Sequence, residues 1–101
     1  LKNMLLDKKI KDKTAKIAVV GLGYVGLPLA IEFVKAGFDV LGIDVDKKKV
    51  NSINNGENYI KDIDDITLRD AVDSNSLNAT DNFSLVKDID FISNMRSYSI
   101  E

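Results

Sequence analysis

The segment that most constrains the fold of this chain lies at residues 16–26, with the sequence K-I-A-V-V-G-L-G-Y-V-G. It begins with a short apolar run rich in β-branched residues, which is typical of a strand buried on both faces of a parallel sheet. Three glycines follow with the spacing G-x-G-x-x-G, and helical periodicity takes over from there. A strand, a glycine turn and a helix in this order predict one βα unit of a parallel sheet.

Each glycine of this turn has its own physical role. Gly21 allows the tight turn out of the strand, Gly23 lets the backbone approach a pyrophosphate, and Gly26 lets the helix lie close to the sheet. The N–H groups of Tyr24 and Val25 then face the phosphates, with the positive end of the helix dipole behind them. We therefore expect a dinucleotide site in which Tyr24 and Val25 bind through their main chains, while their side chains pack.

A carboxylate stands at the end of the second apolar run. Asp44 follows Gly26 by eighteen residues, where dinucleotide-binding folds hydrogen-bond the adenosine ribose. Its charge repels the extra phosphate of NADP, so the sequence predicts NAD as the cofactor. The lysines at 47–49 oppose that preference, because a cation nearby tolerates a 2′-phosphate. A capping or solvated role is the alternative for Asp44, and simple solvation is the alternative for the lysines.

The rest of the hydrophobic pattern repeats the alternation of strand and helix, which implies right-handed crossovers in a parallel sheet. The predicted fold class is α/β: a partial Rossmann-like doubly wound parallel sheet of about four strands, in the order 3-2-1-4, with flanking helices. A chain of 101 residues holds about half of the usual doubly wound fold. The predicted strands are 17–20, 40–43, 77–80 and 89–93, and the predicted helical segments are 24–36, 46–54, 64–72 and 82–86.

Local signals give these elements their ends and faces. Gly37 and Gly56 are expected to stop the first two helices. Asp46 is expected to cap the second helix, and Asp64 or Asp65 the third. The apolar residues predicted on the buried side of the first helix are Val25, Leu29, Phe33 and Val34.

By composition the chain divides into three parts. Residues 1–15 are a lysine-rich arm or helix, residues 16–93 the NAD-binding half-domain, and residues 94–101 an irregular tail. For the first part, a solvated helix or frayed arm is expected, and an amphipathic helix on a lipid surface is the alternative. The residues expected to pack this arm are Leu5, Leu6 and Ile10.

Composition also excludes several classes of function. The net charge of −2 gives the chain no electrostatic match to a nucleic acid or an anionic membrane. Cysteine and histidine are absent, which removes thiolate chemistry and the commonest general base, and fits a cytoplasmic protein. The aspartates between residues 62 and 73 lack the spacing of a calcium loop, so no metal site is expected.

Several segments together carry a more specific likeness. They are G-L-G-Y-V-G-L-P-L-A at 21–30, G-x-D-V-L-G-I-D-V-D at 37–46, Lys49, G-E-N-Y-I at 56–60 and A-T-D-N-F at 79–83. With these segments, residues 16–91 resemble the N-terminal domain of the nucleotide-sugar 6-dehydrogenases, the UDP-glucose and GDP-mannose dehydrogenase family. Within that family the chain is most similar to the UDP-N-acetylhexosamine dehydrogenase branch of bacteria and archaea.

The resemblance implies an enzyme of polysaccharide biosynthesis that oxidises the C6 alcohol of a UDP-sugar to a carboxylate, with two NAD and a cysteine-bound intermediate. It implies that Tyr24 and Val25 lie at the pyrophosphate, Asp44 at the ribose and Lys49 beside the adenosine half. No catalytic residue carries over, since the family's cysteine, lysine and asparagine and its sugar-binding domain fall beyond residue 101. We therefore expect this chain alone to be inactive, and the UDP-sugar to be a partner of a full-length enzyme only.

The C-terminal sequence departs from the family. Where the family has a V-P-T-P loop bordering the nicotinamide, this chain has S-N-M-R-S-Y-S-I-E at 93–101. We expect a truncated open reading frame, a frame-shifted one, or a deliberately cloned fragment.

Two alternatives belong to other classes of function. One is a regulatory Rossmann module that senses a nucleotide without catalysis. The other is a remnant without cofactor function that forms a homodimer, because half a fold leaves an apolar sheet edge and an uncovered face.

Overall fold

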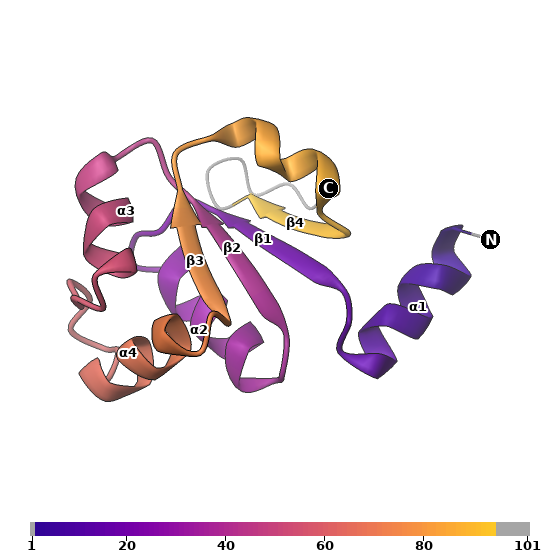
Figure 1. Ribbon diagram of the computed structural model, residues 1–101, viewed down its shortest axis with the longest axis horizontal. Helices are drawn as coiled ribbons and strands as arrows, with labels where there is room; N and C mark the ends of the chain where they lie inside the picture. Colours follow the sequence, from indigo (N-terminus) through magenta and orange to yellow (C-terminus); the bar gives the residue numbers. More distant parts are fainter. Residues whose placement is uncertain (1, 95–101) are drawn as a thin grey trace.

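Four strands form one parallel sheet in the order β3-β2-β1-β4 in the computed structural model, which describes residues 2–94 (Figure 1). Ile17 of β1 lies opposite Val40 of β2 on one side and Phe91 of β4 on the other. The predicted α/β fold and strand order are thereby confirmed. The strands are β1 (Lys16–Val20), β2 (Asp39–Ile43), β3 (Leu77–Thr80) and β4 (Phe91–Asn94).

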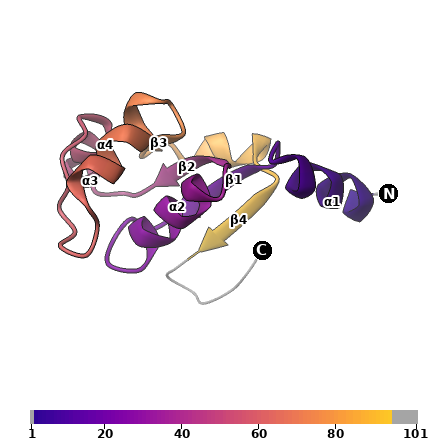
Figure 2. The same ribbon diagram turned by 90° about the horizontal axis from the view of Figure 1, so that it is seen from below.

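Helices connect the strands and bury one face of the sheet. Strand residues such as Ile17, Val40 and Leu77 form a single apolar cluster with residues of α2, α3 and α4. α1 extends away from the sheet, at the end of the molecule opposite α3 and α4 (Figure 1 and Figure 2). The helices are α1 (Lys2–Asp12), α2 (Gly26–Lys35), α3 (Lys47–Asn54), α4 (Asp65–Asp73) and the 3-10 helix η1 (Phe83–Asp88).

The start and the buried face of α2 differ from the prediction. The helix begins at Gly26 instead of Tyr24, because residues 22–25 form the turn. The small residues Gly26 and Ala30 are buried, and they let α2 lie close to the sheet. The buried face therefore follows Gly26 and Ala30, together with the adjacent Leu27 and Ile31. Of the predicted residues, Phe33 and Val34 are half-buried and pack against the core, whereas Leu29 is half-buried and Val25 is exposed. The buried residues of α2 are Gly26, Leu27, Ala30 and Ile31.

The predicted helix ends are confirmed. Asp46 caps α3 by accepting a hydrogen bond from the Lys48 N–H at 2.9 Å. Asp64 caps α4 in the same way, with the N–H of Thr67 as donor at 3.2 Å. Gly37 has the positive φ of 101° that lets a glycine end a helix.

The last strand begins later than predicted. β4 starts at Phe91 instead of Ile89, because Asp90 still belongs to the connection: its N–H donates to the Lys16 carbonyl, and its carboxylate accepts the Lys16 N–H, both at 2.8 Å. The predicted tail began at Asn94, which belongs to β4. The remainder of that tail, residues 95–101, lies outside the described residues.

The N-terminal helix is confirmed, and its predicted packing is confirmed for Leu6 but wrong for Leu5 and Ile10. Leu5 and Ile10 are exposed, and Leu6 packs against the core. An ion pair at 2.9 Å between Lys9 Nζ and Asp90 Oδ1 also connects α1 to the residue before β4, while Leu5 and Ile10 remain exposed to water. None of the helices within residues 2–94 has the length and apolar character needed to cross a membrane.

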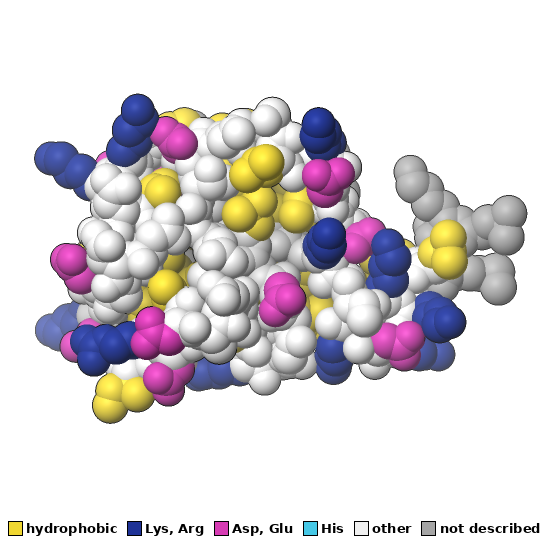
Figure 3. Space-filling model, viewed as in Figure 1, with side chains coloured by type: hydrophobic (Ala, Val, Ile, Leu, Met, Phe, Trp, Pro, Cys, Tyr) yellow, Lys and Arg dark blue, Asp and Glu magenta, His cyan; other side chains and the backbone are white. Residues whose placement is uncertain are grey.

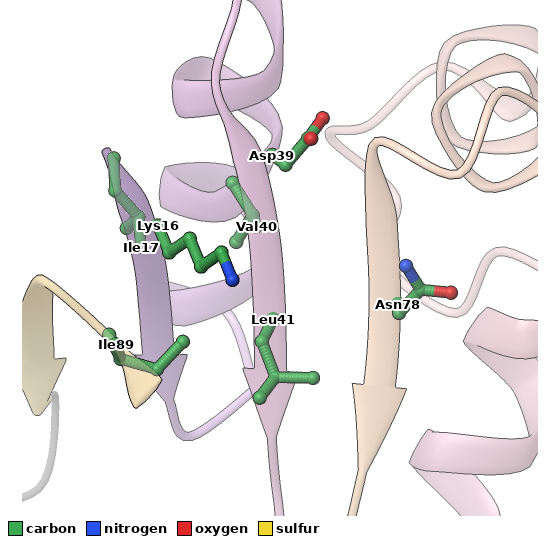
Figure 4. Close-up of a pocket in the computed structure, with 7 residues that line it drawn as sticks. All are labelled: Lys16, Ile17, Asp39, Val40, Leu41, Asn78 and Ile89. Atoms are coloured by element: carbon green, nitrogen blue, oxygen red, sulfur yellow. The ribbon is translucent and has the colours of Figure 1, made fainter. Parts of the chain in front are cut away.

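The sheet face opposite α2 is partly open. Leu41 of β2 and Asn78 of β3 are neighbours in register, and both retain exposed surface. A hollow of about 180 Å³ lies between them and the start of β1, and Figure 4 shows the Lys16 side chain reaching across it toward β2. The hollow is lined by Lys16, Ile17, Asp39, Val40, Leu41, Asn78 and Ile89.

Candidate dinucleotide-binding site

The glycine turn joins β1 to α2 with a backbone that glycine accommodates. Gly21 has a φ of 93°, and its N–H donates to the Ile43 carbonyl at 2.8 Å, so the turn is bonded to the end of β2. The Gly23 carbonyl accepts the N–H of Leu27, which begins the hydrogen bonds of α2. The predicted tight turn at Gly21 is therefore present.

Three backbone amides of the turn are available to a ligand. Within residues 2–94, the N–H groups of Gly23, Tyr24 and Val25 donate to no protein group. Val25 is the N-cap of α2 and provides no side-chain cap. Unused N–H groups at the positive end of a helix dipole bind anions, phosphate in particular.

The side chains of the turn contradict one prediction. Tyr24 is 82% exposed and Val25 60% exposed, so they do not pack as expected. A Cβ placed on Gly23 would have one described heavy atom within 4 Å, Nζ of Lys49 at 4.0 Å. The space beside Gly23, where a side chain would otherwise stand, is therefore open.

Lys49 brings a positive charge to this open space. Its ammonium lies beside Gly23, and the side chain is half-buried in the first turn of α3. The other two lysines of the run make other contacts. Lys47 Nζ lies 3.9 Å from Asp81 Oδ2, and the main-chain N–H of Lys48 donates to the Asp46 carboxylate. The ammonium of Lys49 thus adds to the field of the α2 dipole near the turn.

Asp44 is buried against the turn, with 8% of its surface exposed. Its Oδ2 accepts the Leu22 N–H at 2.8 Å, and its Oδ1 accepts the Asp46 N–H, also at 2.8 Å. The sequence pattern predicted a ribose contact and gave no indication of these two bonds. Asp44 therefore links the end of β2 to both the glycine turn and the cap of α3.

Leu22 anchors the turn, and sequence reasoning missed it. Its side chain is fully buried and lies over β2. A Cβ on Gly42 would fall 2.8 Å from Leu22 Cδ2, so only a glycine at that position of β2 leaves room. A glycine inside an otherwise apolar strand was the available signal, since it marks close approach of another group.

Tyr59 is the second residue that the sequence pattern did not place in the site. Its hydroxyl donates to the Leu22 carbonyl at 2.6 Å. Burial raises the pKa of this hydroxyl far above its ordinary value, and the negative charges of Asp44 and Asp46 raise it further. Leu22 is therefore fixed by three contacts. Its side chain packs against Gly42, its N–H donates to Asp44, and its carbonyl accepts the Tyr59 hydroxyl.

Comparison with known proteins identifies the lineage of this fold. Residues 15–93 match the family model for the NAD binding domain of the UDP-glucose/GDP-mannose dehydrogenase family. The chain is 43% identical over 74 residues to the UDP-N-acetyl-D-mannosamine dehydrogenase of Methanococcus vannielii, covering 72% of this chain and 17% of the relative. A Pyrococcus horikoshii protein of the same name is 40% identical over 67 residues, which cover 65% of this chain and 16% of the relative.

Solved structures agree with the sequence relatives. The UDP-D-ManNAc dehydrogenase of Pyrococcus horikoshii superposes with a TM-score of 0.63 at 38% identity, over 70% of this chain and 17% of that one. The GDP-mannose dehydrogenase of Pseudomonas aeruginosa, solved as a ternary complex, superposes with a TM-score of 0.72 at 27% identity, over 84% of this chain and 21% of that one. The present chain spans only 17% of the length of the first of its relatives above. By its glycine turn, its strand order and its match over residues 15–93, the chain belongs to the UDP-glucose/GDP-mannose dehydrogenase family, as an NAD-binding domain.

Proposed function

We propose that the glycine turn and the ends of β2 and α3 form the NAD site of a nucleotide-sugar 6-dehydrogenase. The observation that carries this proposal is the set of three unused amides at the uncapped start of α2. These amides bind the pyrophosphate, and Asp44 binds the adenosine ribose. Lys49 was expected beside the adenosine half, but because its ammonium lies near Gly23 we assign it to the pyrophosphate as well. The complete set of cofactor-binding residues is Gly21, Gly23, Tyr24, Val25, Gly26, Asp44 and Lys49.

Asp44 selects the form of the cofactor. Its oxygens accept the N–H groups of Leu22 and Asp46, and an ionised carboxylate can accept several hydrogen bonds, including one from a ribose hydroxyl. The same negative charge repels a 2′-phosphate, and its burial limits screening by salt. NAD is therefore preferred over NADP, in spite of the neighbouring lysines.

The sugar chemistry belongs to the longer family enzyme. Two NAD molecules, bound one after the other, would each accept one hydride, because the C6 alcohol of a UDP-sugar loses two hydrides in two successive oxidations to a carboxylate, with water supplying the second oxygen. The 101 residues contain no cysteine that could hold the family's covalent intermediate. We expect this chain by itself to bind the cofactor without turning over a sugar, and for the longer enzyme we propose a cytoplasmic role in polysaccharide biosynthesis.

Calorimetric titration of the chain with NAD, NADP and ADP-ribose tests this proposal. NAD and ADP-ribose are expected to bind, with NADP weaker by roughly tenfold because one carboxylate opposes one phosphate. Tighter binding of NADP than of NAD would contradict the role of Asp44. Preferential binding of ATP would favour the nucleotide-sensing module, which no contact in residues 2–94 specifically supports.

A second proposal concerns self-association of the chain through the open sheet face. Phe83 and Leu85 of η1 are exposed, and Figure 3 shows hydrophobic side chains gathered near the middle of the face that Figure 1 views. Apolar surface next to the hollow at Leu41 favours pairing with a second copy. Light scattering coupled to size exclusion is expected to give a dimer, and a monomer at high concentration would contradict it.

A further inference from the structure

Tyr59 lies in the segment between α3 and α4, distant from the glycine turn in sequence but in contact with it. Its hydroxyl donates to the Leu22 carbonyl at 2.6 Å, and its ring packs against the apolar core. Leu22 stands between Gly21 and Gly23. A side chain from outside the βα unit therefore reaches the centre of the turn.

The backbone around Tyr59 is held in place. The Asn58 side chain donates to the Ile63 carbonyl at 2.5 Å and to Asp65 Oδ1 at 2.9 Å, and it accepts the N–H of Ile60 at 2.9 Å. Ile60 and Ile63 are buried on either side of this loop. The position of the Tyr59 hydroxyl is therefore set by a rigid segment instead of by a free side chain.

The direction of one cofactor-facing amide follows from this contact. Residues 2–94 contain no cis peptide bond, and a trans peptide directs its carbonyl and its N–H in opposite directions. Because the Leu22 carbonyl is directed at Tyr59, the N–H of Gly23 in the same peptide is directed away from Tyr59. On the other side of Leu22, its own N–H is fixed by Asp44.

We propose that Tyr59 is a positioning residue of the cofactor site, whose hydroxyl holds the Leu22–Gly23 peptide in the orientation that presents the Gly23 N–H to the pyrophosphate. This inference rests on the proposed function, and it adds a residue that does not itself touch the cofactor. Without the hydroxyl, the peptide can rotate while the ring still fills its place in the core. Loss of the hydroxyl therefore weakens phosphate binding more than it weakens the fold.

Tyr59→Phe in the full 101-residue chain tests the proposal. The affinity for ADP-ribose is expected to fall by roughly three- to tenfold, the range for loss of one orienting hydrogen bond. Adenosine lacks the pyrophosphate, so its affinity, measured by NMR titration, is expected to change by less than about twofold. The amide resonance of Gly23 is expected to move in the unliganded variant.

Ser74→Ala is the matched control, since it removes a hydroxyl bonded to the Ala71 carbonyl at 3.2 Å, far from the turn in sequence. It is expected to leave both affinities and the Gly23 resonance unchanged. Equal weakening of ADP-ribose and adenosine by Tyr59→Phe, or an unmoved Gly23 resonance, would overturn the proposal. A wild-type chain that binds no ADP-ribose would overturn the proposed function instead, and the Gly23 resonance would still decide whether Tyr59 orients the peptide.

Discussion

The carboxylate of Asp44 accepts a hydrogen bond from the backbone N–H of Leu22 at 2.8 Å, which joins the end of β2 to the middle of the glycine turn. The residue expected to recognise the ribose thus also shapes the loop expected to bind the phosphates. Two halves of the cofactor site are coupled through one buried side chain, so changes at Asp44 affect both.

Asp44→Ala is expected to lower stability as well as cofactor affinity. It leaves the buried N–H of Leu22 without its acceptor, which costs roughly 1–3 kcal/mol. Urea unfolding measures the stability, and calorimetry measures NAD binding under conditions where the variant remains folded. Asp62→Ala, at an exposed aspartate, serves as the control, and equal effects of the two changes would contradict the coupling.

Gly42→Ala is expected to displace Leu22 from its place over β2. The new Cβ would lie 2.8 Å from Leu22 Cδ2, and such overpacking costs roughly 1–3 kcal/mol. Combining it with Leu22→Ala removes the clash, so the double variant is expected to be more stable than the sum of the single effects predicts. Additive effects in thermal unfolding would show that the two residues do not compete for space.

Lys49→Gln is expected to weaken NAD binding by roughly fivefold, corresponding to about 1 kcal/mol for a partly screened charge. The salt dependence of binding should fall as well, since one cation no longer faces the phosphates. Titrations at several salt concentrations measure both effects. Lys48→Gln makes the same charge change at an exposed neighbour, and a loss of affinity as large as that of Lys49→Gln would argue against a specific role.

Asn54→Ala is expected to destabilise the outer edge of β3. The Asn54 side chain donates to the Ala79 carbonyl at 2.9 Å and accepts the Ala79 N–H at 3.0 Å, so one amide satisfies both groups. Removing it costs roughly 1–3 kcal/mol and frees an edge that can pair with another chain. Urea unfolding and light scattering measure the two effects. Asn55→Ala, at the exposed end of α3, is the control, and a variant as stable and as monodisperse as wild type would contradict the assignment.

Asp90 is expected to contribute to stability in a pH-dependent way. The backbone N–H of Lys16, followed by the Lys9 side chain, lowers the pKa of its carboxyl below the ordinary value. Since the folded pKa is below the unfolded one, the stabilisation is complete above the unfolded value and is lost as the pH falls through the folded value. Urea midpoints from pH 2 to 7 should therefore decline less steeply below about pH 4 in Asp90→Asn than in wild type. Asp88→Asn, in exposed η1, should retain the wild-type slope.

The features that sequence predicted well are those set by short-range chemistry. The caps at Asp46 and Asp64 bond to N–H groups two and three positions away, and the turn at Gly21 needs the positive φ that glycine itself allows. These signals can be recognised within a few neighbouring residues. The strand order also followed, because short right-handed crossovers leave a parallel sheet few alternatives. The start of β4 and the position of α1 were predicted less well, since long-range bonds to Asp90 contribute to both.

By itself, the sequence determined the fold class, the dinucleotide turn and the family, because each depends on the spacing of residue types along short stretches of the chain. Only the tertiary structure decided that Leu22 is the anchor of that turn, with Gly42 beneath it, Asp44 at its N–H and Tyr59 at its carbonyl. These partners come from β2, its end and the loop after α3, so no local pattern links them. These residues meet because packing of the sheet and helices brings separate segments of the chain together. There, a buried polar group without a hydrogen bond would cost free energy, so each one is paired.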